Sequence, residues 1–242
     1  MRNLPATLYI GAVGATGAVI LATSLRTAAH AGLGAGLLAW ITIACLTALM
    51  GRLSVRLPLA ASCRLSFSDA FVVLSLLLFG TDLATLTGAI EGCFATPNKP
   101  GTWHKRLFNT GGLAIAVNLS SRLFERMVRP AGAAGFLAVQ PGRLLLGMIV
   151  LAAALYSINV ALVAGVVALT ERVPLATVWQ ASFSWTGTCC LAGAVAAALV
   201  MGVSPQAGIH SVLAVTPFPV ALYFTYRSVA QKFHPSTTPT RG

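Results

Sequence analysis

Acidic residues are scarce in this chain. Only 5 of its 242 residues are Asp or Glu, against 16 Lys or Arg, and charged residues make up 9% of the composition. Hydrophobic residues make up 57%, so the chain has too little polar surface to cover a water-soluble globule. The composition therefore places the protein in a lipid bilayer.

Motifs for catalysis or metal binding are also lacking. The four histidines, His30, His104, His210 and His234, lie in separate segments, and none forms an HExxH motif or a close pair with an acid. The five cysteines include no CxxC pair. No Gly-rich phosphate loop follows a strand, because no segment has the pattern of a convincing strand. We expect no enzyme activity, no metal site and no cofactor.

The net charge of +11 raises the question of a nucleic-acid partner. The basic residues are dispersed over the segments between apolar blocks, and they form no cluster interleaved with aromatic residues. This pattern favours anionic membrane lipids as partners over nucleic acid.

Long apolar runs fill most of the sequence. They measure roughly 18 to 25 residues and alternate with short segments that hold Arg, Lys, Pro and His, as about 30 Å of hydrocarbon requires of helices. An outer-membrane barrel would show strict alternation instead. We expect an all-α transmembrane bundle of about eight spans, near residues 7–25, 33–50, 68–79, 82–95, 107–124, 144–169, 180–201 and 209–226.

The third and fourth spans are short. In an alternative with seven spans, residues 68–95 form a single kinked span instead. The positive-inside rule distinguishes the two topologies. With eight spans and a cytoplasmic N-terminus, 11 Lys and Arg residues lie inside and 5 outside, whereas the seven-span alternative divides them 8 to 8. We therefore expect eight crossings of a bacterial inner membrane, with both termini cytoplasmic.

Three of the five acids lie between residues 66 and 94, and two of them have places typical of helix caps. Ser66 and Asp69 fit the Ser-x-x-Asp form of a capping box, in which both side chains satisfy free N–H groups at a helix start. Gly80 is suited to end that helix in a left-handed conformation, and Thr81 or Asp82 to cap the next one.

The third acid, Glu91, lies well inside its helix and near the inner end. It either pairs with a cation across the following loop, as acids in membrane helices usually do, or belongs to a ligand or ion site. Asn109 lies one turn after Arg106, at the depth of Glu91, whereas Asn118 is nine residues further and should lie on the opposite face. Glu91, Arg106 and Asn109 form our candidate signal or ligand pocket, and plain interhelical hydrogen bonding is the alternative for the amides.

Three stretches resemble a known family. They are "VRLPLAASCRLSFSDAFVVLSLLLFG" (residues 55–80), the pair Glu91-Gly92, and "RLFNTGGLAIAVNLSSRLF" (residues 106–124). Together they resemble the multi-span membrane sensor (MASE-type) region that precedes a diguanylate cyclase or HD-type phosphodiesterase domain in bacterial signalling proteins. The resemblance runs from about residue 4 to residue 232. It implies that residues 221–233, with Tyr226, Arg227 and Lys232, form an exit helix leading toward an output domain.

Residues 234–242, "HPSTTPTRG", form neither a coiled coil nor a catalytic domain, so we expect a bundle over residues 1–233 and a short flexible tail. Cyclic-dinucleotide chemistry does not carry over to this chain, which contains no GGDEF-like, EAL-like or His-Asp motif. The resemblance favours a sensor that acts through its exit helix on an output domain or partner, as a monomer or a homodimer. The alternatives are a small-molecule transporter, or the substrate-binding subunit of an uptake system, and a vestigial fragment.

Overall fold

The described part of the chain is a bundle of helices with one small hairpin. The computed structural model describes residues 4–31, 34, 36–52, 55–57, 60–65, 68–96, 99–128, 141–178, 216, 217, 220, 221 and 224. Its elements are α1 (Leu4–Ala31), α2 (Gly36–Arg52), β1 (Val55–Leu57), β2 (Ala60–Leu65), α3 (Asp69–Phe79), α4 (Thr81–Ala95), α5 (Trp103–Val128) and α6 (Pro141–Glu171). The expected helices over the first six apolar blocks are confirmed. The blocks at 180–201 and 209–226 lie largely or wholly outside the described residues.

The described residues confirm the all-α fold class, and the short hairpin of β1 and β2 corrects only the expectation that no segment forms a strand. The two strands pair antiparallel, with Val55 opposite Leu65 and Arg56 opposite Arg64. Each strand contains an alternation of apolar, Arg and apolar residues, which is the two-residue period of a strand. That period extends over only three residues in each strand, which is too short to predict a strand from the sequence.

A single glycine separates α3 from α4. The Gly80 N–H donates a hydrogen bond of 2.9 Å to the Leu76 carbonyl, and its own carbonyl accepts one of 3.1 Å from the Ala84 N–H. Gly80 therefore closes one helix and begins the next, with φ of +86°, a value that favours glycine. The expected division of this region into two short helices is confirmed.

Helix α3 lies in the interior. All residues from Ala70 to Leu77 are buried, which agrees with a sequence that is apolar on every face. Its side chains join those of α2, α5 and α6 in the main core cluster, which includes Ile43, Phe124 and Leu151. Because the neighbouring helices cover α3, its length of about 16 Å does not have to match the thickness of a bilayer.

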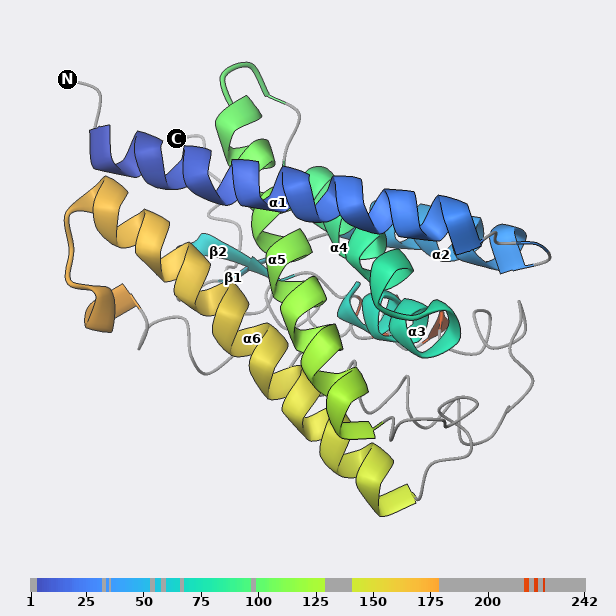
Figure 1. The fold of residues 1–242 in the computed structure, drawn as a ribbon. Helices are drawn as coiled ribbons and strands as arrows, with labels where there is room; N and C mark the ends of the chain where they lie inside the picture. Colours follow the sequence, from blue (N-terminus) through green and yellow to red (C-terminus); the bar gives the residue numbers. More distant parts are fainter. Residues whose placement is uncertain are drawn as a thin grey trace, which may run out of the picture.

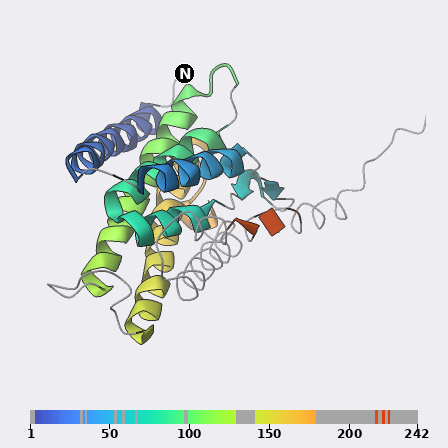
Figure 2. The ribbon, with the colours of Figure 1, turned by 90° about the vertical axis from the view of Figure 1, so that its right-hand side faces the viewer.

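Successive helices from α2 to α6 alternate in direction. The start of α2 lies against the end of α3, where a Cβ on Gly36 would be 3.2 Å from the Phe79 ring, and the end of α2 lies against the end of α4 at Gly51 and Ala95. The start of α6 likewise contacts the end of α5 through Gly147. Figure 1 shows α5 near the middle of the bundle, with α1 crossing it and α6 running along its other side. Figure 2 shows the bundle from the right-hand side, with α2 and α3 side by side.

The crossing of α1 and α5 depends on two glycines. A Cβ on Gly17 would clash with the backbone of Gly111, and a Cβ on Gly111 would lie 2.8 Å from the Val13 carbonyl oxygen. Only residues without a side chain allow two helix backbones to approach this closely. Gly11, by contrast, is exposed, and a Cβ there would meet nothing within 4 Å.

We predict that Gly17→Ala lowers the free energy of unfolding by about 1–3 kcal/mol, because the added methyl group forces the two backbones apart. The matched control, Gly11→Ala, should leave stability unchanged or raise it by up to about 1 kcal/mol, since alanine favours a helix. Thermal unfolding in mild detergent, followed by circular dichroism, measures both. Equal responses would contradict the crossing.

Candidate functional site

Three hydrogen bonds connect α4 and α5 along the whole length of α4. The Asn109 amide donates to the Thr96 hydroxyl at 2.9 Å, the Asn118 amide donates to the Thr85 hydroxyl at 3.2 Å, and the Thr81 N–H donates to the Glu125 carboxylate at 3.2 Å. We call these six residues the α4–α5 seam. Their order shows that the two helices run antiparallel in a single register.

Glycines bring the two helices together between these bonds. A Cβ on Gly92 would clash with the backbone of Asn109, and one on Gly88 would lie 2.7 Å from a methyl group of Val117. Such close approach makes short side chains such as Thr and Asn long enough to reach across the interface. The seam therefore needs two kinds of residue. Glycines allow the two helices to come close together, and hydroxyl and amide side chains form the hydrogen bonds between them.

Asn118 uses both ends of its amide group in hydrogen bonds. It is 5% exposed, its amide nitrogen donates to Thr85, and its carbonyl oxygen accepts a hydrogen bond of 2.9 Å from Nε of Arg122. The Thr85 hydroxyl in turn donates to the Thr81 carbonyl at 2.7 Å. A continuous chain of hydrogen bonds thus leads from a guanidinium on the surface of α5 to the first turn of α4.

Asn109 and Asn118 of α5 both donate hydrogen bonds to residues in or directly after α4. Nine residues do turn a straight helix by half a revolution. Asn109, however, bonds to Thr96, which lies one residue beyond the last residue of α4, whereas Asn118 contacts the helix body. The two amides therefore reach α4 at different points on its surface.

The three residues of the candidate pocket lie where α4 ends and α5 begins. Glu91 is 3% exposed and sits one residue before Gly92, which contacts the backbone of Asn109. Glu91 and Arg106 each already interact with another residue, and Asn109 bonds to Thr96. The carbonyl of Glu91 also lies against Gly51 at the end of α2. The ends of α2 and α4 and the start of α5 thus meet around Glu91, and its role in binding a ligand stays a prediction.

The capping residues differ from those expected. Ser68 is the N-cap of α3, since its carbonyl accepts hydrogen bonds from Phe71 and Val72, and Asp69 is then the first helical residue rather than the third of a capping box. Ser66 lies outside the described residues. The sequence suggested the box because Ser66 and Asp69 have the correct spacing, but Ser68 offers a start closer to the apolar run.

The cap of α4 comes from a distant residue. Gly80 occupies the N-cap position and Asp82 the second helical position, so Asp82 is not the N-cap. The Thr81 N–H is instead satisfied by the Glu125 carboxylate, 44 residues away on α5. Asp82 remains in the first turn, where a negative charge is favourable beside the positive end of the helix dipole. No local pattern in the sequence points to Glu125, because the two residues meet only through the packing of α5 on α4.

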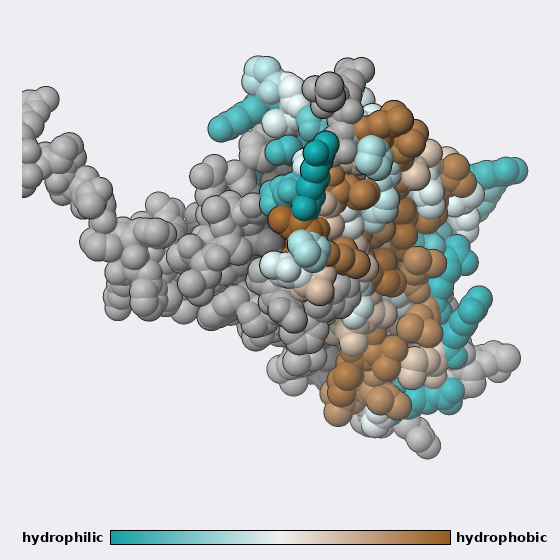
Figure 3. Space-filling model, turned by 90° about the vertical axis from the view of Figure 1, so that its left-hand side faces the viewer, coloured by the Kyte–Doolittle hydropathy of each residue, from teal (hydrophilic) through white to brown (hydrophobic). Residues whose placement is uncertain are grey.

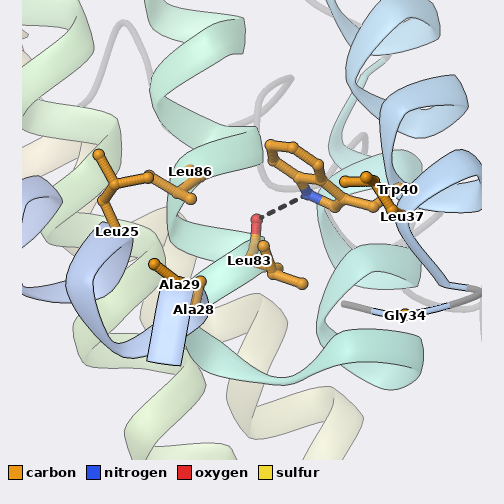
Figure 4. Close-up of a pocket in the computed structure, with 8 residues that line it drawn as sticks. All are labelled: Leu25, Ala28, Ala29, Gly34, Leu37, Trp40, Leu83 and Leu86. Carbon is orange, nitrogen blue, oxygen red and sulfur yellow. Dashed lines mark hydrogen bonds between the residues drawn. The ribbon is translucent and has the colours of Figure 1, made fainter. Parts of the chain in front are cut away.

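A second polar group connects α2, α3 and α4. Nε1 of Trp40 donates to the Thr87 hydroxyl at 3.2 Å, and that hydroxyl lies 3.1 Å from the hydroxyl of Ser75 on α3. Thr87 and Ser75 are both buried. Figure 4 shows Trp40 beside a cavity of about 260 Å³ whose lining is almost wholly apolar: Leu25, Ala28, Ala29, Gly34, Leu37, Trp40, Leu83 and Leu86. The indole also donates to the Leu83 carbonyl at 3.4 Å, so its one N–H group is used within the protein.

The residues expected to form the signal exit helix, Tyr226, Arg227 and Lys232, lie outside the described residues, as does the tail at 234–242. Among the residues that the structure describes, no group of three His, Cys, Asp or Glu side chains has a geometry suited to a metal ion.

Comparison with known proteins gave no match to a family model, to a curated protein or to a solved structure. The resemblance to MASE-type sensor regions therefore stays a prediction from the sequence.

We predict that Glu125→Ala lowers the free energy of unfolding by about 0.5–2 kcal/mol, because it removes the cap of α4. Glu125→Gln keeps an oxygen acceptor for the Thr81 N–H and should lose less. Glu171→Ala, at the exposed end of α6, is the control for the loss of one negative charge and should be neutral. Chemical unfolding in detergent measures all three, and equal losses in Glu125→Ala and Glu171→Ala would refute the cap.

Proposed function

We propose that this protein is a multi-pass sensor or regulatory module of a bacterial inner membrane. Helices α1 and α6 are each long and apolar enough to cross a bilayer. Large apolar side chains are also exposed on them, among them Leu4, Leu8, Leu145 and Leu146. Figure 3 shows such side chains gathered in one broad area. Water-soluble proteins rarely expose a surface of this kind, and lipid would cover it.

The contacts between helices support the proposal of eight crossings. Helices α2 to α6 alternate in direction, as a chain that crosses a membrane repeatedly must do. The Lys and Arg residues of the described part of the chain divide unequally between the two ends of the bundle. The end where α4 stops and α5 starts has seven of them, Arg52, Arg56, Arg64, Lys99, Lys105, Arg106 and Arg172, and the other end has four, Arg26, Arg122, Arg126 and Arg143. The positive-inside rule makes the first end cytoplasmic, together with the two termini.

The observation that carries the sensor proposal is that polar side chains between the helices bond to one another. Asn118 bonds to Thr85, Asn109 to Thr96, and Trp40 to Thr87. A transporter needs polar groups that face a solute, as well as a cavity in which to hold it. Helices joined by hydrogen bonds and glycine contacts form an interface with discrete packings, which is what a two-state relay requires.

In this proposal a ligand, a lipid or a membrane state shifts the bundle between two packings. The region of Glu91, Arg106 and Asn109 receives the signal at the cytoplasmic end, and the C-terminal segment with Tyr226, Arg227 and Lys232 passes it to an output domain or a signalling partner. A homodimer is compatible with this scheme. The alternative is a small-molecule transporter or the substrate-binding subunit of an uptake system.

We predict that a cysteine at His30 is labelled by a membrane-impermeant maleimide in intact spheroplasts, whereas a cysteine at Lys99 is labelled only after the membrane is permeabilised. Both positions are exposed, and they lie at opposite ends of the bundle. The measurement is made in a background that lacks the natural cysteines. The reverse pattern would overturn the orientation, and equal labelling of both in intact spheroplasts would overturn the crossings between them.

Purification of the full chain from its native membrane in mild detergent, with mass spectrometry of the proteins that accompany it, tests the function. Recovery of a cyclase, phosphodiesterase or kinase is the expected result. Recovery of ATPase subunits would contradict the sensor and favour the uptake system.

A further inference from the structure

Two arginines lie one turn apart on the exposed face of α5. Arg122 and Arg126 are both exposed, and the structure gives neither of them an acidic partner within the described part of the chain. Like charges at this spacing on a helix repel each other. An anion between the two guanidinium groups would remove the repulsion and gain hydrogen bonds from both.

Arg122 is held in place from inside the protein. Its Nε donates to the carbonyl oxygen of Asn118 at 2.9 Å, and Asn118 is itself buried and bonded to Thr85. A guanidinium group carries five N–H donors, so the four on its terminal nitrogens remain for a ligand. An arginine that is fixed at one edge loses less conformational entropy on binding than a mobile one. Arg122 is therefore better prepared to bind an anion than Arg126.

Exposed apolar side chains accompany the two arginines on α5. Leu119 is 49% exposed and Leu123 is 42% exposed, and each lies within one turn of Arg122. Leu119 lies nearer the centre of the helix than both arginines, and Leu123 lies between them in the sequence, so exposed leucine and arginine side chains share the last part of α5. A free anion uses only the basic part of this surface. A phospholipid uses both parts, because its acyl chains cover leucine while its phosphate meets arginine.

We propose that Arg122 and Arg126 bind the phosphate of an anionic phospholipid, whose acyl chains lie on Leu119 and Leu123. The site depends on the proposed membrane location but not on the signalling role. Asn118 acts as a positioning residue, and through Thr85 it joins the lipid site to the first turn of α4. Lipid bound at this face would therefore favour the packing of α4 on α5 seen in the structure.

The test compares lipid retained by the full chain after extraction from bilayers of phosphatidylglycerol and phosphatidylcholine in equal amounts. Native mass spectrometry counts the lipids of each kind that stay bound. The variants are Arg122→Gln and Arg126→Gln, and the control is Arg26→Gln, which removes the same charge from an exposed position on α1. Because Arg126 makes no hydrogen bond within the described residues, its variant tests the site even where Arg122→Gln disturbs folding.

The wild type and Arg26→Gln should retain phosphatidylglycerol in preference, and each of the two α5 variants should retain about fivefold less of it. An equal loss in all three variants would show diffuse attraction to the surface and would overturn the site, as would no loss in either α5 variant. An excess of inorganic phosphate should leave the lipid bound. Complete displacement of the lipid by phosphate would show that Arg122 and Arg126 bind a free anion instead. Retention of neither lipid by the wild type would overturn the membrane location, and this site with it.

Discussion

The contact between α4 and α5 sets the positions of the other described helices. A buried polar side chain is costly unless it finds a hydrogen-bond partner on another helix or in its own backbone, and lipid around the proposed membrane bundle would offer none. The α4–α5 seam meets this constraint with three bonds distributed from Thr81 to Thr96. Glycines at 88 and 92 allow the approach that these short side chains need. With α4 fixed, α3 is enclosed through the Gly80 turn, and α1 and α6 pack on the remaining sides of α5 (Figure 1).

Hydrogen bonds of the seam connect the surface of the bundle with its interior. The exposed Arg122 bonds to Asn118, Asn118 to Thr85, and Thr85 to the backbone of the first turn of α4. Glu125 meets that turn from the other direction. Hydrogen bonds therefore connect the exposed face of α5 to the start of α4, and Glu91 lies near the end of the same helix. The proposed relay would use this connection.

The sequence was informative where a pattern is local. Apolar block length predicted the first six helices, and the special backbone freedom of glycine predicted the break at Gly80. The sequence was much less informative where two distant segments meet. Glu125 caps α4 only because α5 packs antiparallel to it, and Ser68 rather than Ser66 starts α3 because the competing residue lies nearer to the apolar run. Each strand of the hairpin is too short for its alternation to indicate a strand. Asn109 bonds to Thr96, which follows the last residue of α4, and helix periodicity alone does not predict such a contact.

The packing of α4 on α5 rests on side chains of the α4–α5 seam that bond to one another across the two helices. A double-mutant cycle on Asn118→Ala and Thr85→Val measures this bonding most directly, through unfolding of the wild type, both single variants and the double variant in detergent. The structure predicts a coupling free energy of about 0.6–1.7 kcal/mol between the two positions, since each variant removes the same bond. Strictly additive losses would show that the two side chains do not interact and would contradict the seam.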